Sequence, residues 1–320
     1  MGCKNVMVYV ETAEGKPVNV GLEMLTAAKD VAEKVTAVVI GAGAADAAAT
    51  AIAYGADDAI TVDAAEYNTE AYAAIVVELV KKYAPEMLFV GATSNGKDLG
   101  ARVAAKLKAG CVTDVIGIKE ADGKFVFTAP LYGGTIYSDV TVDGTVVAII
   151  RGGIFKKVDE PDTAKQGTIT AETVEAGDLR AKIVNSVQEI SESVNLEEAD
   201  VIVAGGRGMG SVENFELVKE LASLMGGVVG ATRPVIDEGW ISRAHQVGQS
   251  GKIVAPKLYI AAGISGAAQH VSGITGSDFI VAINKDEDAT IFEYSDVGIV
   301  GNATEAIKVL IEEVKKIQAQ

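Results

Sequence analysis

The sequence lacks several features that would narrow its function at once. It has only two cysteines in 320 residues, Cys3 and Cys111, and they form neither a CxxC motif nor a pair with a nearby histidine. We therefore expect both thiols to be reduced and structural. No apolar run approaches the ~18 residues of a membrane span, and residues 1–6, MGCKNV, lack the apolar region of a signal peptide. The simplest expectation is a cytoplasmic protein without a membrane span.

Basic and aromatic residues are also scarce. Lys and Arg number 28 against 44 Asp and Glu, which gives a net charge of −16. This balance argues against a nucleic-acid partner or a broad surface for anionic membranes. Aromatic residues make up 5% of the chain and hydrophobic residues 49%, with Ala, Val and Ile prominent. Such a composition suits buried parallel strands covered by Ala-rich helices.

The first half alternates predicted strands with predicted helices. Strands are expected at 4–11, 36–43, 59–63 and 87–93, and helices at 19–35, 69–83 and 97–110. This order predicts a parallel sheet with helices on both faces. Between 112 and 154 the turns ADG, YGG and VDG separate short alternating runs, which predicts hairpins added to that sheet. The polar stretch 155–177 is expected at its edge.

A second α/β series follows an acidic interruption. Residues 186–199, SVQEISESVNLEEA, break the pattern, so we expect a first domain at 1–188 and a second at 189–320. The predicted fold class is α/β, with a mostly parallel sheet flanked by helices in each domain. The predicted strands of the second domain end in Gly, Ser, Thr, Arg, His and Asn. Because ligands bind at the carboxyl ends of parallel strands, we expect the chemistry there.

Two of these strand ends carry an arginine. The stretch 204–211, AGGRGMGS, places Arg207 among glycines between a strand and a helix, where backbone N–H groups attract anions. The motif is an incomplete dinucleotide fingerprint, and no acidic residue ends a strand ~20 residues later. Thr232 and Arg233 follow another strand, and Pro234 stops further pairing. Two such arginines favour an anionic ligand, although a tight turn with exposed arginines stays open.

Two further stretches carry directional polar groups. The loop 245–257, HQVGQSGKIVAPK, combines small residues with amides, which both donate and accept as a heteroaromatic edge requires. In 263–270, GISGAAQH, we expect Ser265 to cap a short helix that begins at Gly266 and carries His270. A helix start and a donating histidine would stabilise negative charge on a ligand. The alternatives are a surface turn and a core histidine.

Two asparagines complete the candidate site. Asn284 ends a predicted strand and Asn302 precedes the last predicted helix, so either could be an ordinary turn or cap residue. The sequence has no Ser–His–Asp order, HExxH motif, zinc spacing or Walker loop. The candidate site is therefore rich in positioning groups and poor in nucleophiles and bases.

Taken together, these motifs resemble the α subunit of electron transfer flavoprotein. The resemblance covers the whole chain and is most specific between 205 and 302, where QVGQSGK, GISGAAQH and AINKD occur in order. Residues 93–107 are similar to a segment of the family's other domain. The resemblance implies that the second domain is a Rossmann-like FAD-binding domain and that the chain pairs with a β subunit. It also implies electron transfer from acyl-CoA dehydrogenases of fatty acid oxidation, or from other flavoprotein partners.

The resemblance further implies which residues contact FAD. Arg207 would contact the pyrophosphate or adenosine side, and three side chains would tune the flavin: Arg233 against the isoalloxazine, Ser250 at N5 and O4, and His270 at N1 and C2=O. Where Asn302 stands the family would offer Asp, so that contact loses its charge. The implied cofactor-binding residues are Gly206, Arg207, Gly208, Thr232, Arg233, Gln246, Val247, Gly248, Gln249, Ser250, Ser265, Gly266, Ala267, Ala268, Gln269, His270, Asn284 and Asn302.

Other functions stay open from the sequence. An electron-bifurcating relative, with a second FAD in the β subunit and NADH as donor, would share these motifs. An NAD-dependent dehydrogenase is opposed by the missing acidic residue and acid–base pair. A nucleotide-binding regulatory module is opposed by the absence of a phosphate loop in the first domain. An electron carrier, whose cofactor supplies the chemistry, fits better than a self-contained catalyst.

Overall fold

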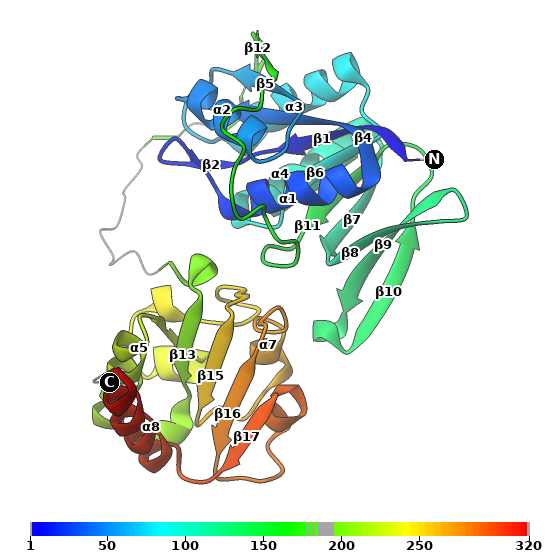
Figure 1. Cartoon of the computed structure of the whole chain (residues 1–320). Coiled ribbons are helices and arrows are strands. Elements are labelled where there is room, and N and C mark those ends of the chain that lie inside the picture. The colour runs from blue at the N-terminus through cyan, green and yellow to red at the C-terminus, as the bar shows by residue number, and fades with distance from the viewer. Residues whose placement is uncertain (1, 178, 182, 185–194, 319–320) are drawn as a thin grey trace. The chain divides into compact units, whose positions relative to one another are not determined.

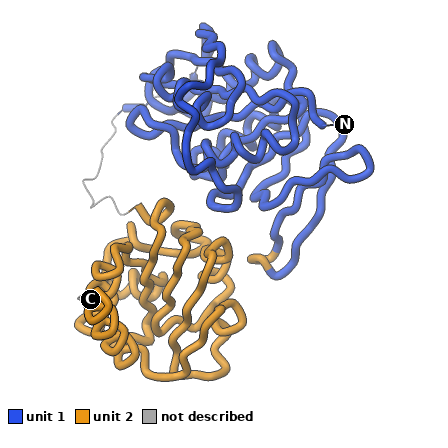
Figure 2. The backbone as a smooth tube through the Cα atoms, in the orientation of Figure 1, with its two compact units in different colours: residues 1–131, 135–187 blue, residues 132–134, 188–320 orange. Residues whose placement is uncertain are grey.

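A computed structural model of the chain describes residues 2–177, 179–181, 183–184 and 195–318. Figure 1 labels its helices and strands. The chain divides into two compact units, shown in separate colours in Figure 2: unit 1 comprises residues 1–131 and 135–187, and unit 2 comprises residues 132–134 and 188–320. Most of the acidic stretch in which we expected the domain junction lies outside the described residues.

Unit 1 is built on a seven-stranded sheet in which all pairings are parallel. In sheet order its strands are β12 (Thr168–Glu172), β5 (Asp58–Val62), β4 (Ala32–Ile40), β1 (Cys3–Tyr9), β6 (Met87–Gly91), β11 (Val146–Ile150) and β7 (Gly110–Val115).

Helices cover both faces of this sheet, as the alternating pattern predicted. One core contains residues of α1 (Asn19–Val31) and α2 (Ala44–Ala53), and the other contains residues of α3 (Thr69–Tyr83) and α4 (Ser94–Leu107). The central strands are buried on both sides, which is why they read as continuous Val, Ile and Ala runs.

Two local expectations for unit 1 were wrong. Residues 32–35 were expected to be helical, but they begin β4 and pair with β1, because ladder hydrogen bonds outweigh their helical spacing. The expected hairpins do not extend the main sheet: β8 (Gly117–Ala121), β9 (Lys124–Leu131) and β10 (Ile136–Thr141) form a separate antiparallel sheet. A second small sheet pairs β2 (Thr12–Ala13) with β3 (Lys16–Pro17).

Unit 2 has a five-stranded sheet that is also parallel throughout. α5 (Val212–Leu224) and α8 (Ala303–Gln318) pack on one face, as Figure 1 shows, and loops with the short α7 (Ala268–Val271) cover the other. In sheet order the strands are β14 (Val228–Ala231), β13 (Val201–Gly205), β15 (Leu258–Ala262), β16 (Ile280–Asn284) and β17 (Val297–Val300).

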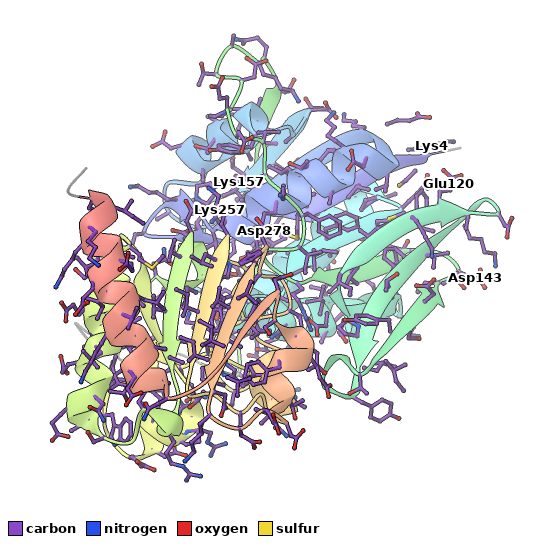
Figure 3. All side chains as sticks on the ribbon, turned by 60° about the horizontal axis from the view of Figure 1, so that its bottom comes forward. Lys4, Glu120, Asp143, Lys157, Lys257 and Asp278 are labelled. Atoms are coloured by element: carbon purple, nitrogen blue, oxygen red, sulfur yellow. The ribbon has the colours of Figure 1, made fainter. Side chains whose placement is uncertain are left out.

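The strand order of unit 2 reverses between β13 and β15. From β13 the chain first adds β14 on one side and then β15 on the other, so the connections leave β13 and β15 in opposite directions. Such a switch point opens a crevice at the carboxyl edge of a parallel sheet. Lys257 and Asp278, labelled in Figure 3, lie one residue before β15 and two residues before β16, and they mark the opposite, amino edge. In the described part of the chain, no helix is long and apolar enough to cross a membrane.

Candidate functional site

A cavity of about 670 Å³ lies at the carboxyl edge of the sheet in unit 2. Residues that follow β13, β14 and β15 line it together with the last residue of β16, so four strand ends meet around one space. The sequence-predicted residues all line this cavity except Gly266, Ala268 and Asn302. Pro234, Gly263 and Ile264 line it as well, although sequence reasoning did not select them as site residues.

Glycines allow the loops after β13 and β15 to cross in contact. The Gly208 N–H donates to the Gly263 carbonyl at 3.0 Å. A Cβ at Gly206 or Gly208 would lie 2.3 or 2.6 Å from that same oxygen, closer than real side chains approach. Gly263 itself has φ +63°, in the left-handed region that favours glycine. The glycine turn therefore brings bare backbone to the cavity wall and carries the exposed Arg207 at its tip.

Arg233 lies at the start of a helix and not on the strand. β14 ends at Ala231, and α6 runs over Arg233–Asp237 with Pro234 in its first turn, where proline is tolerated. The Arg233 guanidinium lies 3.4 Å from the Asp237 carboxylate, and both side chains are exposed. Exposed pairs of this kind contribute about 0–1 kcal/mol. A ligand anion can therefore compete for this arginine.

The loop after η4 (Arg243–His245) is held from several sides. The Val247 N–H donates to the Ala231 carbonyl at 3.0 Å, and the Gln249 N–H donates to the Gln269 carbonyl at 2.7 Å. The buried Gln246 donates its Nε2 hydrogen to Ser250 Oγ at 2.8 Å. Because the Ser250 oxygen accepts this bond, its own hydrogen can point to a ligand.

The expected helix start at Gly266 is wrong. α7 is a four-residue helix that begins at Ala268, and Ser265 does not cap it. The Ser265 carbonyl instead accepts a hydrogen bond from the Ile291 N–H at 3.1 Å, in η5 (Thr290–Tyr294). Gly266 packs so closely there that an added Cβ would lie 2.2 Å from the same nitrogen. This contact with a distant segment holds residues 265–266 outside the helix, and Gly266 is buried and does not line the cavity.

His270 is buried and bonded through both ring nitrogens. Its Nδ1 lies 3.1 Å from the Val247 carbonyl oxygen, and its Nε2 lies 3.0 Å from Tyr259 Oη. Burial lowers the pKa of His270 to about 4, so the ring is neutral at neutral pH. Sequence reasoning missed Tyr259. The available signal was a tyrosine inside an aliphatic strand, because a buried phenol usually finds a hydrogen-bond partner.

The two asparagines have different positions. Asn284 ends β16 and lines the cavity, where its Nδ2 donates to the Ile264 carbonyl at 2.8 Å. Asn302 does not line the cavity. Its side-chain oxygen accepts from the Thr304 N–H at 2.9 Å, which is the bond of a residue that caps α8. The structure therefore places Asn302 as a helix cap, which was the alternative that the sequence left open.

The arrangement suits an anionic, partly aromatic ligand. The lining residues include two arginines but no aspartate, glutamate, lysine or cysteine. Glycine backbone can approach phosphate groups closely, while amide and hydroxyl side chains can meet the edge of a heteroaromatic ring. The volume of the cavity lies within the usual range for cofactor pockets. Among the described residues, no group of three or more His, Cys, Asp or Glu could hold a metal ion.

Comparisons with known proteins point to the same kind of ligand. Residues 6–177 match the family model of the electron transfer flavoprotein domain, and residues 195–275 match that of the electron transfer flavoprotein FAD-binding domain. The chain is 42% identical to an electron transfer flavoprotein subunit alpha from Thermoanaerobacterium thermosaccharolyticum, over 98% of this chain and 99% of that one. It is 38% identical to the alpha subunit from Bacillus subtilis, over 98% of both chains. It is also 39% identical to protein FixB from Clostridium saccharobutylicum, over 98% of this chain and 97% of that one.

Proposed function

Because this chain belongs to the electron transfer flavoprotein alpha-subunit family, whose cofactor is FAD, we propose that it is the flavin-carrying subunit of a heterodimeric electron carrier. The observation that supports this most is the composition of the cavity wall in unit 2. It combines two arginines, glycine backbone and neutral polar groups, with no carboxylate and no nucleophilic thiol among the lining residues. Such a wall can bind and tune a redox cofactor.

We assign the parts of the site to parts of FAD. Arg207 and the backbone N–H groups of the glycine turn would hold the pyrophosphate, because the guanidinium is cationic and the glycine N–H groups can be approached closely. Arg233 and Ser250 would lie against the flavin ring, where the guanidinium favours negative charge and the hydroxyl donates to a ring acceptor. When bound, FAD supplies the one- and two-electron chemistry that these side chains lack.

The partners follow from the same proposal. The second subunit would be an electron transfer flavoprotein β subunit, and unit 1 would be the structural part that docks against it. Electrons would come from a dehydrogenase of the acyl-CoA type or from another flavoprotein. The described part of unit 1 supports a structural role, because its own side chains occupy the corresponding edge of its sheet, as with Glu11, Thr93 and Asn95.

Flavin stoichiometry and an anaerobic reductive titration test this function. The chain would be co-expressed with an electron transfer flavoprotein β subunit, and bound flavin would be counted before the titration is followed by absorbance. One FAD per heterodimer that accepts electrons supports the simple carrier. Two FADs, with reduction by NADH, would replace the simple carrier by the bifurcating form. No flavin, even after addition of FAD, would refute the proposal.

A further inference from the structure

Gln246 is a polar residue that lines the cavity and yet has almost no exposed surface. It is 4% exposed and directly follows η4. Its backbone is held on both sides: its N–H donates to the Arg243 carbonyl at 3.0 Å, and its own carbonyl accepts from the Lys252 N–H at 2.7 Å. An isolated β-bridge also joins it to Ala231, the last residue of β14. The Gln246 side chain therefore starts from a fixed point at the carboxyl edge of the sheet.

The chain turns back after Gln246 and brings Ser250 onto its side chain. The Gly251 N–H donates to the Gly248 carbonyl at 2.9 Å, which closes a tight turn. An added Cβ at Gly251 would lie 2.3 Å from the Gln246 carbonyl oxygen and 2.9 Å from Gln246 Cγ, closer than real side chains approach. In this arrangement Ser250 Oγ lies 2.8 Å from Gln246 Nε2. The backbone of the loop therefore sets the contact between the two side chains.

The hydrogen bond between these side chains has one direction. An amide nitrogen only donates, whereas a hydroxyl oxygen both accepts and donates. The Gln246 amide therefore uses a lone pair of Ser250 Oγ and leaves the hydroxyl hydrogen unused. Within the described ranges of the chain, Ser250 Oγ has no second hydrogen-bond partner. Because Ser250 is exposed and lines the cavity, its hydrogen is available to a ligand.

We propose that Gln246 is a positioning residue of the flavin site, whose amide holds the Ser250 hydroxyl so that its hydrogen is donated to the flavin ring. This inference rests on the proposed function, because it assumes that flavin occupies the cavity. A serine hydroxyl without such a partner rotates freely, and a ligand that binds it must then fix the rotation. Holding the hydroxyl before the ligand arrives removes that cost. Accepting one hydrogen bond also strengthens the bond that the same hydroxyl donates.

A double-mutant cycle in FAD affinity tests the proposal, because it separates action through Ser250 from direct contact with the ligand. The full chain, co-expressed with an electron transfer flavoprotein β subunit, is stripped of flavin and titrated with FAD by fluorescence. Gln246→Met keeps the length of the side chain but removes the amide. We expect Gln246→Met and Ser250→Ala each to bind FAD about 2- to 12-fold more weakly. The double variant should bind as Ser250→Ala does, within about 2-fold.

Two further measurements separate positioning from a general effect on the fold. The visible absorption bands of bound flavin respond to hydrogen bonds to its ring, so Gln246→Met and Ser250→Ala should shift these bands in the same direction. Gln318→Met is the control, because Gln318 is an exposed glutamine of unit 2 that does not line the cavity. This variant should bind FAD with the affinity and the spectrum of the parent chain.

Additive losses in the double variant, or an unshifted flavin spectrum in Gln246→Met, would overturn the role of Gln246. The residue would then contact the ligand by itself or act only on the fold. No FAD binding by the parent chain would refute the proposed function and this inference with it. FAD binding with additive losses would refute only the role of Gln246.

Should Gln246→Met fail to fold, Gln246→Glu gives the same comparison in a side chain of nearly the same shape. A carboxylate can only accept, so it would take the Ser250 hydrogen away from the ligand. The added charge acts both in the parent chain and in Ser250→Ala, and it therefore cancels when the two losses are compared. We expect the larger loss of FAD affinity where Ser250 is present, and equal losses would overturn the proposal.

Discussion

The two large parallel sheets of this chain end in different ways. In unit 1 the chain fills its own carboxyl edge: the Glu11 carboxylate, which follows β1, accepts hydrogen bonds from Thr93 and Asn95 at the start of α4. In unit 2 the corresponding edge carries glycines, arginines and neutral polar groups around a cavity of about 670 Å³. Both sheets have parallel strands and helical cover. Topology supplies the edge, and the residues at the strand ends decide whether it becomes a site.

The arginines of the two edges show the same contrast. Arg151 follows β11 in unit 1, is 7% exposed, and donates from Nε to Asp114 at 2.8 Å. Its charge is thus matched by a carboxylate inside the protein. Arg207 and Arg233 in unit 2 are exposed, and the carboxylate nearest Arg233 lies on an exposed side chain. A cation is available to a ligand only where the protein has not neutralised it in a buried pair.

The largest effect should come from adding a side chain to the glycine loop at the carboxyl edge of the sheet in unit 2. In Gly208→Ala the new Cβ would lie 2.6 Å from the Gly263 carbonyl oxygen. To relieve this overlap, the loop after β13 and the loop after β15 would have to separate, which would break the bond from the Gly208 N–H to that oxygen. Overpacking of this kind costs about 1–3 kcal/mol, so we expect about 5- to 150-fold weaker FAD retention together with a lower melting temperature. Flavin content and thermal unfolding measure the two effects.

Gly301→Ala is the matched control for that variant. Gly301 is also in unit 2, and an added Cβ there meets no heavy atom within 4 Å. It should retain flavin and melt as the parent chain does. Equal flavin retention in Gly208→Ala and Gly301→Ala would show that the crossing of the two loops is not part of the site.

Removing the available cation should have the next largest effect. Arg233→Ala deletes a guanidinium that lines the cavity, and hydrogen bonds to charged groups contribute about 1.5–3 kcal/mol. We expect FAD to bind about 10- to 150-fold more weakly, measured by the recovery of flavin fluorescence on dilution. Arg243→Ala is the control, because Arg243 is an exposed arginine of unit 2 that does not line the cavity. If both variants lose flavin equally, the lower positive charge of unit 2 as a whole explains the effect, and contact between Arg233 and the ligand does not.

The buried histidine predicts a pH dependence of stability in unit 2. Burial lowers the pKa of His270 from 6.5 to about 4, so the unfolded chain binds this proton more readily than the folded chain. The contribution is therefore present above pH 6.5 and is lost as the pH falls toward 4. Between about pH 6.5 and pH 5 it amounts to about 2 kcal/mol.

Denaturant unfolding of the parent chain and of His270→Gln at several pH values measures this contribution. The parent chain should lose stability over the stated range, and the variant should lose less. Parallel pH curves for the two proteins would mean that His270 is already protonated, or not buried, in the folded chain.

Local signals predicted the helices of unit 1 better than the turns of unit 2. The helix predicted at 69–83 has those same bounds, because the Asn68 side chain accepts from the Glu70 and Ala71 N–H groups at its start. The irregular segment at Ser265 and Gly266 was wrongly predicted to start a helix. What determines it is contact with Ile291, and no local spacing reports a contact so distant in sequence.

The candidate site could be predicted in outline for a related reason. Glycines and polar residues that directly follow apolar strands mark the carboxyl edge of a sheet, so most of the residues selected from the sequence line the cavity. The bond between Tyr259 and His270 could not be predicted, because it depends on how β15 and α7 pack. Asn302 was ambiguous, since a residue before a helix suits a cap as well as a ligand contact.

The smallest effect on the site should come from a change at the carboxyl edge of the sheet in unit 1, where side chains of the unit bond to one another. Glu11→Gln keeps the size of the side chain but removes the charge that accepts from Thr93 and Asn95. Charge-assisted hydrogen bonds are about twice as strong as neutral ones, so we expect a loss of about 1 kcal/mol in the free energy of unfolding. FAD retention should not change, because Glu11 is not in the unit that carries the cavity.

Glu160→Gln, at an exposed position of unit 1, is the control and should change neither quantity. A loss of flavin in Glu11→Gln would end the contrast between the units, because the edge of unit 1 would then take part in cofactor binding.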